Sequence, residues 1–375
     1  MATEKRYYEL DSLRGVAAMT VVFHHFLFIL PSISDNEKAF WYFKYTPLHL
    51  FWAAHEAVIF FFLLSGFVLS LQFFGKKVHY SGFFIKRICR IYIPYLAAVT
   101  VAVICSQLFY SGHKPTLSIW FNSVWTEKPT LPLIANHLAF ITDFHNGAFD
   151  PVLWSLVHEM RISLLFPLII FLVIRFNWKT NVFLACLFSM AGMVLHYIAK
   201  FKFHYQADFF MTIHYIAMFI FGALLAKHRV ELVQKYQSFS QRGRYSLVLF
   251  AIPLYLFGWI FQRTILPSNL GWFPDWIISA GVAVFIISAI GSDRINRVLL
   301  WPPIHFLGKT SYSVYLFHAI ILFCLVHSLY ATVPIIGIWM IGLVLTILIS
   351  TASFKYVELP SIAAGRILSD ISKKF

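Results

Sequence analysis

Several ionisable side chains lie inside long apolar stretches of this sequence, where a charge costs at least ~2.5 kcal/mol and therefore needs a reason. Three of them are His25, Glu159 and His318. An imidazole with its ordinary pKa of about 6.5 can take a proton from a weak nucleophile near neutral pH. A carboxylate can orient such an imidazole, bind a polar substrate or relay a transferred group. The alternative for each histidine is a packing role held by hydrogen bonds.

Three arginines stand at the ends of these stretches. Arg14 precedes His25 by eleven residues, about 20° past three helical turns, so the two share a helix face roughly 16 Å apart. Asp11 lies three residues before Arg14 and can pair with it. Arg87 and Arg90 are also three apart on one face. Because guanidinium binds phosphate in a bidentate fork, this pair is either a clamp for a phosphorylated donor arriving from the cytoplasm or an ordinary topology signal.

A polar stripe surrounds Glu159. Ser155, Glu159 and Ser163 are four residues apart and share a face, and His158 and Arg161 lie in the same stretch. This pattern predicts a polar pocket opening to the outer side, or else a structural cluster that neutralises itself.

A second stripe runs through Tyr312, Tyr315 and His318, which are three residues apart and reach the middle of their stretch. His214 and His327 are interpreted as structural, and Glu358 as an anchor of the last apolar stretch.

The elements that must position these residues are transmembrane helices. The 375 residues are 59% apolar and only 12% charged, with 41 Phe, whereas soluble domains carry about 25% charged residues. Each apolar run is long enough to cross a ~30 Å hydrocarbon layer. The runs are 13-31, 48-74, 91-111, 152-174, 181-199, 208-226, 245-262, 272-291, 304-330 and 335-357. The sequence thus predicts an all-α, polytopic integral membrane protein with about ten transmembrane helices.

The basic residues predict the orientation of these helices. With the N-terminus in the cytoplasm, the inside segments hold 22 Lys and Arg and the outside segments 7, while Arg161 lies within a span. This bias places both termini in the cytoplasm. The net charge of +14 is spread in clusters between apolar runs, which argues against a nucleic-acid partner. The four cysteines form no CxxC, so no metal site is expected.

The chain is expected to form a single domain over residues 1-375, with a membrane core at about 8-360 and a short cytoplasmic tail at 361-375. The first run follows a short charged segment without a small-residue cleavage site, so we expect a retained first span. The longest outside loop, 112-151, is long enough to be functional, and its window 131-142 is expected to be interfacial or re-entrant.

Six motifs in order resemble the membrane acyltransferase-3 family, over about residues 8 to 360. They are LDSLRGVAAMTVVFHH, FFLLSGFVLS, the Arg87-x-x-Arg90 pair, LWSLVHEMRISLLFP, LGKTSYSVYLFH and FKYVELP. The resemblance implies an integral membrane O-acyltransferase that modifies sugars of envelope polysaccharides, lipid-linked glycans or small natural products. The block after Glu159 departs from the family, since Met160 to Ser163 replace a second acidic residue, a glutamine and an aromatic pair. This departure bears on the acceptor more than on the chemistry.

The resemblance also implies roles for single residues. His25 and Glu159 match catalytic positions of the family, and Arg14, Arg87 and Arg90 match basic positions that we assign to the donor. Acceptor-binding or supporting roles fall to a larger set. These residues are Asp11, Trp154, Ser155, His158, Arg161, Tyr315 and His318.

The expected reaction moves an acyl group, most simply acetyl, from cytoplasmic acyl-CoA to a sugar hydroxyl of an envelope or exported glycan, in the cell (plasma or inner) membrane. No bound cofactor is expected, and acyl-CoA (acetyl-CoA) is the co-substrate. The expected partners are acyl-CoA, a carbohydrate acceptor and the lipid bilayer. Direct transfer and an acyl-histidine intermediate both stay open. So do a transporter or flippase of an acyl or glycan precursor and an N-acyltransferase on an amino sugar.

Overall fold

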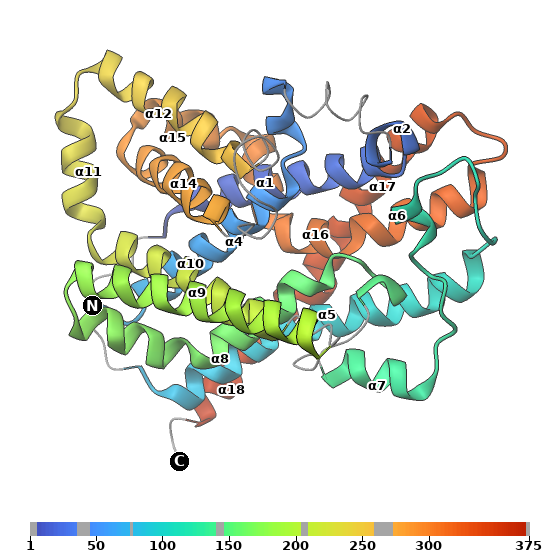
Figure 1. Ribbon diagram of the computed structural model, residues 1–375, viewed down its shortest axis with the longest axis horizontal. Coiled ribbons are helices and arrows are strands. Elements are labelled where there is room, and N and C mark those ends of the chain that lie inside the picture. The colour runs from blue at the N-terminus through green and yellow to red at the C-terminus, as the bar shows by residue number, and fades with distance from the viewer. Residues whose placement is uncertain are drawn as a thin grey trace. The chain divides into compact units, whose positions relative to one another are not determined.

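The computed structural model describes residues 6–35, 46–75, 78–139, 146–203, 209–258 and 273–372, and within these ranges the chain is helical without strands (Figure 1). Residues divide between two compact units. Unit 1 comprises Met1–Thr20, Pro47–Lys77 and Leu165–Ser311, and unit 2 comprises Val21–Thr46, Val78–Leu164 and Tyr312–Phe375.

Eight helices among the described residues are long and apolar enough to cross a membrane, which confirms the all-α, polytopic membrane class. They are α4 (Ala54–Leu71), α5 (Tyr80–Phe109), α8 (Leu153–Arg175), α9 (Trp178–Lys202), α10 (Phe209–Lys227), α14 (Phe273–Gly291), α16 (Pro302–Leu329) and the continuous stretch Ile335–Ser372.

The other two predicted spans are helical where the structure describes them. Helix α1 (Tyr8–Phe28) has 21 residues, but Asp11, Arg14 and two histidines make it more polar than the eight. Helix α12 (Gln241–Tyr255) covers the start of the predicted span 245-262, whose last residues, 259-262, lie outside the described residues. Several basic residues of the topology count also lie outside them, so the cytoplasmic position of the termini stays a prediction. These are Lys5, Lys38, Lys44, Lys76, Lys77, Arg263, Lys373 and Lys374.

Close helix packing through glycine holds unit 1 together. Helix α10 packs against α4 and α9, and α12 packs against α14. A Cβ at Gly222 would come 1.9 Å from the carbonyl oxygen of Leu63, and one at Gly66 would come 2.3 Å from that of Phe219. Because only glycine permits this approach, Gly66 in α4 and Gly222 in α10 serve as packing sites.

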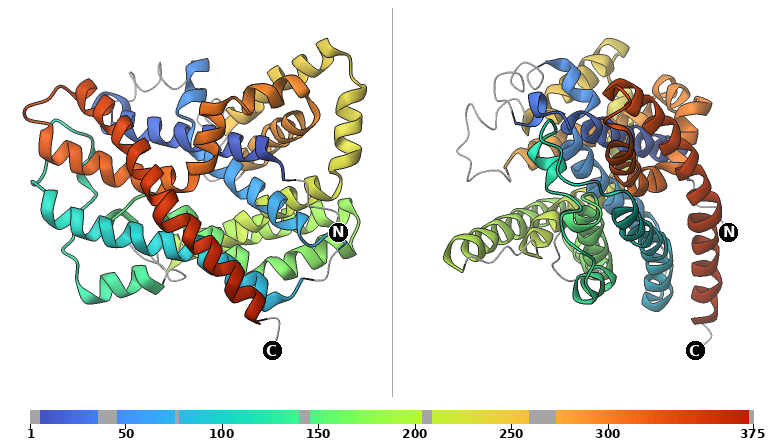
Figure 2. Two further views of the ribbon diagram at one scale, coloured as in Figure 1. Left: turned by 180° about the vertical axis from the view of Figure 1, so that it is seen from behind. Right: turned by 90° about the vertical axis from the view of Figure 1, so that its right-hand side faces the viewer.

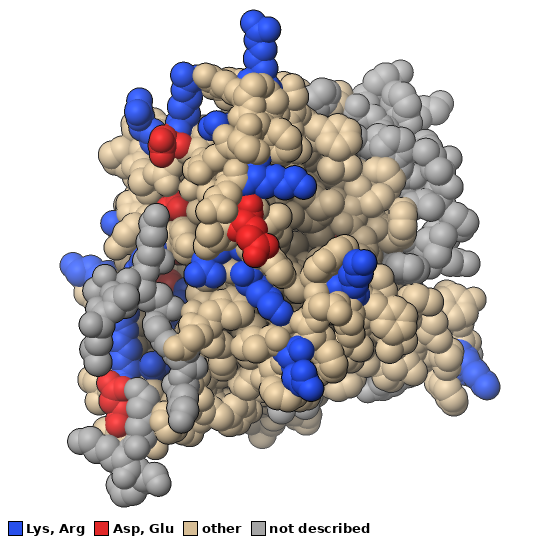
Figure 3. All heavy atoms as spheres, turned by 90° about the vertical axis from the view of Figure 1, so that its left-hand side faces the viewer, with Lys and Arg blue, Asp and Glu red and all other residues tan. Residues whose placement is uncertain are grey.

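Two short helices of unit 1 connect longer ones and carry basic side chains. Helix α11 (Arg229–Ser238) and helix α15 (Asp293–Leu299) are rich in Arg and Lys. The space-filling view shows Lys and Arg gathered over an otherwise mostly uncharged surface (Figure 3). Clusters of this kind are typical of the segments that set topology.

The last helices of unit 2 run on beyond the predicted membrane core. Helix α17 (Ile335–Ser353) continues through a π-helical turn at Phe354–Glu358 into α18 (Leu359–Ser372), which appears as one long red helix in Figure 2. Residues 361-372 of the predicted tail are therefore helical, and α18 packs against α5. A Cβ at Gly365 would lie 2.8 Å from the Cβ of Cys89, so glycine again allows the close approach.

The loop 112-151, which the sequence predicts to be the longest outside loop and which we call the outer loop, also belongs to unit 2. It contains two short α-helices among the described residues, α6 (Ile119–Asn122) and α7 (Leu131–Ala139). Helix α7 occupies the window predicted to be interfacial or re-entrant, and residues 140-145 lie outside the described residues. Trp125 has a left-handed φ of 61°, and its indole N–H donates to the Phe149 carbonyl at 2.7 Å. A residue other than glycine holds this conformation only where its surroundings fix it, so the loop has a defined conformation at Trp125.

Candidate active site

Two of the sequence-predicted histidines meet in unit 2. His25 Nδ1, near the end of α1, lies 2.9 Å from His318 Nε2 on α16, and His318 Nδ1 lies 3.0 Å from the Val314 carbonyl. A carbonyl only accepts, so His318 Nδ1 carries a hydrogen, and in the neutral ring its Nε2 is then an acceptor. His25 Nδ1 therefore donates to His318, which leaves the Nε2 lone pair of His25 unused.

An indole from the outer loop covers the His25 ring. Trp120 in α6 stacks on it with centroids 5.1 Å apart and planes 7° apart. His25 is half-buried, and His318 is fully buried. Sequence reasoning did not select Trp120. The available signal was an aromatic residue in the one outer loop too long to be a turn.

Tyr315 links the histidine pair to helix α8. Its hydroxyl lies 2.7 Å from Ser155 Oγ and donates to the Val152 carbonyl at 3.2 Å, and its ring lies 6.0 Å from the His318 ring. The structure thus brings together Tyr315, His318 and Ser155, which the sequence placed on two separate stripes. Among the described residues, the hydrogen-bonding partner of His25 is His318 rather than Glu159.

Glu159 pairs with one of the two neighbouring arginines. Arg87 Nη2 on α5 donates to Glu159 Oε1 at 3.0 Å and to Ser163 Oγ at 3.1 Å, and Arg87 is buried while Arg90 is exposed. The two arginines therefore have different environments, which their spacing alone did not predict. Arg87 organises the stripe around Glu159, whereas Arg90 is the one open to a ligand.

Tyr312 joins this cluster to the last helix. Its hydroxyl donates to the Ile91 carbonyl at 2.8 Å and lies within electrostatic range of Arg87, Arg90, Glu159 and Glu358. The carboxylate of Glu358, in the π-helical turn, accepts from Ser313 at 2.9 Å. Glu358 thus ties the last helix to α16. The π-helical turn that carries Glu358 coincides with the FKYVE part of the FKYVELP motif.

The remaining predicted residues of α8 are largely inside unit 2. His158 and Arg161 are buried, and the Trp154 and His158 rings meet edge to face at 5.9 Å. Asp150 precedes this helix in the loop and is also fully buried. Burial raises the pKa of Asp150 to about 8, although its hydrogen bond from the Val152 N–H opposes the rise.

Asp11 and Arg14 belong to unit 1. Arg14 Nη1 lies 3.2 Å from Asp11 Oδ1, as their spacing predicts, and Arg6 also bonds Asp11 at 2.9 Å. A Cβ at Gly15 would come 2.4 Å from the Gly308 backbone nitrogen, so α1 crosses α16 tightly beside this pair. The donor role of Arg14 stays a prediction.

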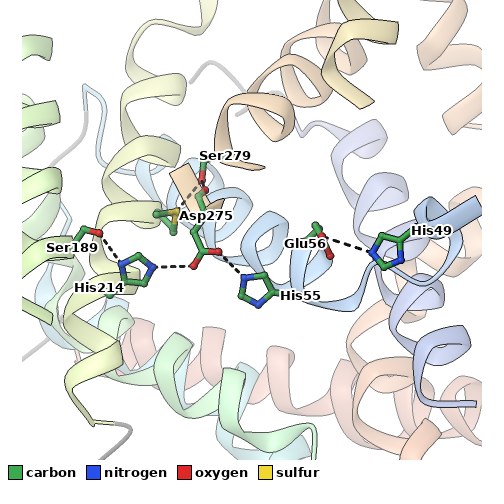
Figure 4. A network of polar contacts seen from close by, with 8 residues as sticks. His49, His55, Glu56, Ser189, His214, Asp275 and Ser279 are labelled. Atoms are coloured by element: carbon green, nitrogen blue, oxygen red, sulfur yellow. Dashed lines mark hydrogen bonds and ion pairs between the residues drawn. The ribbon is translucent and has the colours of Figure 1, made fainter. Parts of the chain in front are cut away.

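Unit 1 holds a second histidine network, which sequence reasoning missed (Figure 4). Asp275 on α14 lies 2.6 Å from His55 Nε2 on α4 and 3.0 Å from His214 Nε2 on α10. His214 Nδ1 lies 2.8 Å from Ser189 Oγ, which accepts from the Trp276 indole at 3.1 Å. His214 is thus held by hydrogen bonds, one of them with an aspartate far away in sequence, and its structural role stays a prediction.

These observations define a polytopic membrane protein with a histidine pair, His25 and His318, and a charged stripe formed by Arg87 and Glu159. The model of the acyltransferase domain family (Acyl_transf_3) matches residues 7–355, and the chain belongs to that family.

Two relatives of the chain carry O-acetyltransferase names, one of them as a putative O-acetyltransferase. The chain is 26% identical over 329 residues to O-acetyltransferase OatA of Staphylococcus aureus (strain NCTC 8325 / PS 47), covering 80% of this chain and 51% of the relative. It is 24% identical over 332 residues to the putative O-acetyltransferase SACOL0978 of S. aureus (strain COL), with the same coverage. The chain spans about half the length of these curated relatives. No solved structure matches the chain.

Proposed function

We propose that this protein is a membrane O-acetyltransferase that moves an acetyl group from acyl-CoA to a sugar hydroxyl of an envelope or exported glycan. The observation that carries the proposal is the directed hydrogen bond from His25 to His318. It leaves one basic nitrogen, His25 Nε2, on a half-buried ring in a membrane acyltransferase.

His25 acts as the general base in this proposal. A sugar hydroxyl is a poor nucleophile at neutral pH, and a positioned base contributes ~10²–10⁴-fold to such a step. Nε2 takes the hydroxyl proton while the oxygen attacks the thioester carbonyl. The tetrahedral intermediate then expels the CoA thiolate, which receives the proton back from the imidazolium. The C–O bond forms, the C–S bond breaks, and the proton moves from oxygen to sulfur.

His318 is a positioning residue in this step. Its Nε2 accepts from His25 Nδ1 before and after proton transfer, so it fixes the tautomer and strengthens its bond when the ring becomes cationic. Because the Val314 carbonyl fixes the His318 ring, the hydrogen bond from His25 to His318 in turn fixes the orientation of the His25 ring.

The charged stripe supplies the donor side. Arg90 is exposed and can take a phosphate of CoA, whereas Arg87 already holds Glu159. Glu159 is within one helical turn of Ser155, which contacts Tyr315. A ligand between the arginines and the histidine pair would therefore meet Glu159 and Tyr312 on its way. The cytoplasmic origin of the donor rests on the predicted topology.

The test is purified protein in lipid with labelled acetyl-CoA and a panel of glycan acceptors. Transfer that depends on His25 supports the proposal, and undiminished transfer by a folded His25→Ala variant would contradict it. Alkaline lability of the product separates an ester from the amide that an N-acyltransferase would form. Counterflow of intact glycan without transfer would favour the transporter.

Arg90→Ala tests the donor side. We expect KM for acetyl-CoA to rise with kcat nearly unchanged, because an exposed phosphate contact binds ground state and transition state alike. Lys86→Ala is the matched control, since Lys86 is an exposed cation in the same segment. Equal effects of the two substitutions would indicate a general surface charge instead of a clamp.

A further inference from the structure

We propose that Trp120 stabilises the cationic form of His25 during acyl transfer, as a stacked cation–π partner supplied by the outer loop. The inference rests on the proposed function, because it requires that His25 becomes an imidazolium. Trp120 is then a positioning residue that acts through the base.

The geometry is that of a parallel, stacked contact. The Trp120 and His25 rings are 7° from parallel with centroids 5.1 Å apart, within the ~6 Å at which a cation is attracted by an indole face. His318 meets His25 through a nitrogen–nitrogen contact of 2.9 Å, with the two ring planes 20° apart. The hydrogen bond and the stacked indole together fix the orientation of the His25 ring and so aim the Nε2 lone pair.

The energetic effect is selective for the protonated ring. The indole face carries negative quadrupole density, so it attracts the imidazolium more than the neutral imidazole. His25 is neutral before it accepts the hydroxyl proton and charged at the tetrahedral intermediate. An interaction that strengthens only then lowers the barrier, and it raises kcat without changing substrate binding.

The loop is built to hold Trp120 in place. Ser118 Oγ caps α6 by accepting from the Phe121 N–H at 3.1 Å, and the Ser118 N–H donates to the Ile29 carbonyl at 2.9 Å. Asn122 accepts from the Lys114 N–H at 2.8 Å and donates to the Lys114 carbonyl at 2.9 Å. Trp120 also packs against Phe323. The bond from Ser118 to Ile29 ties the short helix that carries Trp120 to the segment that follows His25, and the Asn122 bonds hold that helix against the rest of the loop.

The experiment replaces Trp120 with mono-, di- and trifluorotryptophan in the full-length protein. Fluorine withdraws density from the ring face with little change in size, so we expect kcat to fall stepwise. The total fall should be about 2- to 30-fold, the equivalent of a ~0.5–2 kcal/mol cation–π contact. KM for acetyl-CoA and for the acceptor should stay constant. A merely structural tryptophan would give a flat series.

Trp125 is the matched control. It lies five residues further on, is buried, and stacks on His327 with planes 14° apart. Fluorination there should leave kcat unchanged, and an equal slope at Trp125 would overturn the assignment. A flat series at Trp120, or a rise in either KM at constant kcat, would also overturn it. His25→Ala separates the two proposals: if that variant is inactive, a flat series removes only the role of Trp120, and if it is active, the base assignment fails first.

Discussion

Each unit holds a pair of histidines, of which one is buried and one half-buried, but the two units satisfy them in opposite ways. In unit 1, His55 and His214 both turn an Nε2 toward one carboxylate, Asp275 (Figure 4). In unit 2, His25 and His318 turn toward each other. A buried carboxylate requires hydrogen bonds or a nearby positive charge, and the two imidazoles of unit 1 can supply either. The neutral pair of unit 2 has no such requirement.

The histidines of the two networks differ in which ring nitrogens have partners. Around Asp275 each carboxylate oxygen has an imidazole partner, and His214 Nδ1 is bonded by Ser189, so both nitrogens of His214 are engaged. This network ties α4, α9, α10 and α14 together. Among the described residues, His55 bonds through Nε2 alone and His25 through Nδ1 alone. Under the proposed function, His25 is the base and His214 is a brace.

The carboxyl groups show the reverse pattern. Unit 1 gives its buried aspartate two imidazoles, whereas Asp150 of unit 2 accepts one backbone bond at Oδ1 and its Oδ2 has no hydrogen-bond partner among the described residues. Unit 2 thus keeps an acid protonated where unit 1 keeps one charged.

The largest expected effect is the loss of the proposed base. His25→Ala should lower the rate of acetyl transfer by about 10²–10⁴-fold, the range for removing a positioned general base. The rate is measured with labelled acetyl-CoA at matched protein levels. His24→Ala, the adjacent histidine, should change the rate by no more than a few-fold. Similar losses in both would mean that damage to α1, and not loss of a base, explains the result.

Next in size is a difference in stability between the two histidine pairs. Asp275→Leu leaves buried imidazoles without their counter-charge and should destabilise the protein by about 3–5 kcal/mol. His318→Leu breaks only a neutral hydrogen bond and should cost about 1–3 kcal/mol. Unfolding in mixed micelles measures both. Equal costs would show that unit 1 carries no charged pair.

The fold and its chemical residues were predictable to different extents. Hydropathy identified the membrane helices, because a bilayer imposes the length and composition of each span. The motifs selected His25, His318, Glu159 and Arg87 as candidate site residues, and the structure joins them as two pairs, His25 with His318 and Arg87 with Glu159. The partners of these residues were not predictable. Arg87 pairs with Glu159, and Asp275 with His55, and each pair is far apart in the sequence and meets only through the packing of helices.

Asp11 with Arg14 shows the limit from the other side. Its spacing of three predicts the observed pair, because neighbours on one helix turn need no tertiary information. The contact between Trp120 and His25 could not be predicted in this way, because it depends on a loop that folds back over the end of α1.

A third, smaller effect is the pH dependence that Asp150 imposes on unit 2. Burial raises the pKa of Asp150 to about 8 in the folded protein, against about 3.9 for an unfolded chain. The folded state then binds the proton more tightly, so stability falls as pH rises from about 4 to about 8 and levels off above. The free energy of unfolding should fall by about 2 kcal/mol between pH 6 and pH 8, and Asp150→Asn should remove that fall. Parallel curves for the two proteins would show that Asp150 ionises normally.

The smallest effect concerns the outer member of the network around Asp275. Ser189→Ala removes the hydroxyl that bonds His214 Nδ1 but leaves both imidazole–carboxylate contacts in place. Because the same hydroxyl accepts from the Trp276 indole, two hydrogen bonds are lost, and we expect a loss of about 1–2 kcal/mol, seen as a small shift of the unfolding transition. Acetyl transfer per folded molecule should be unchanged, because the network lies in unit 1 and its histidines keep their carboxylate. A selective loss of transfer at normal stability would mean that the unit 1 histidines take part in the reaction, and the division between brace and base would fail.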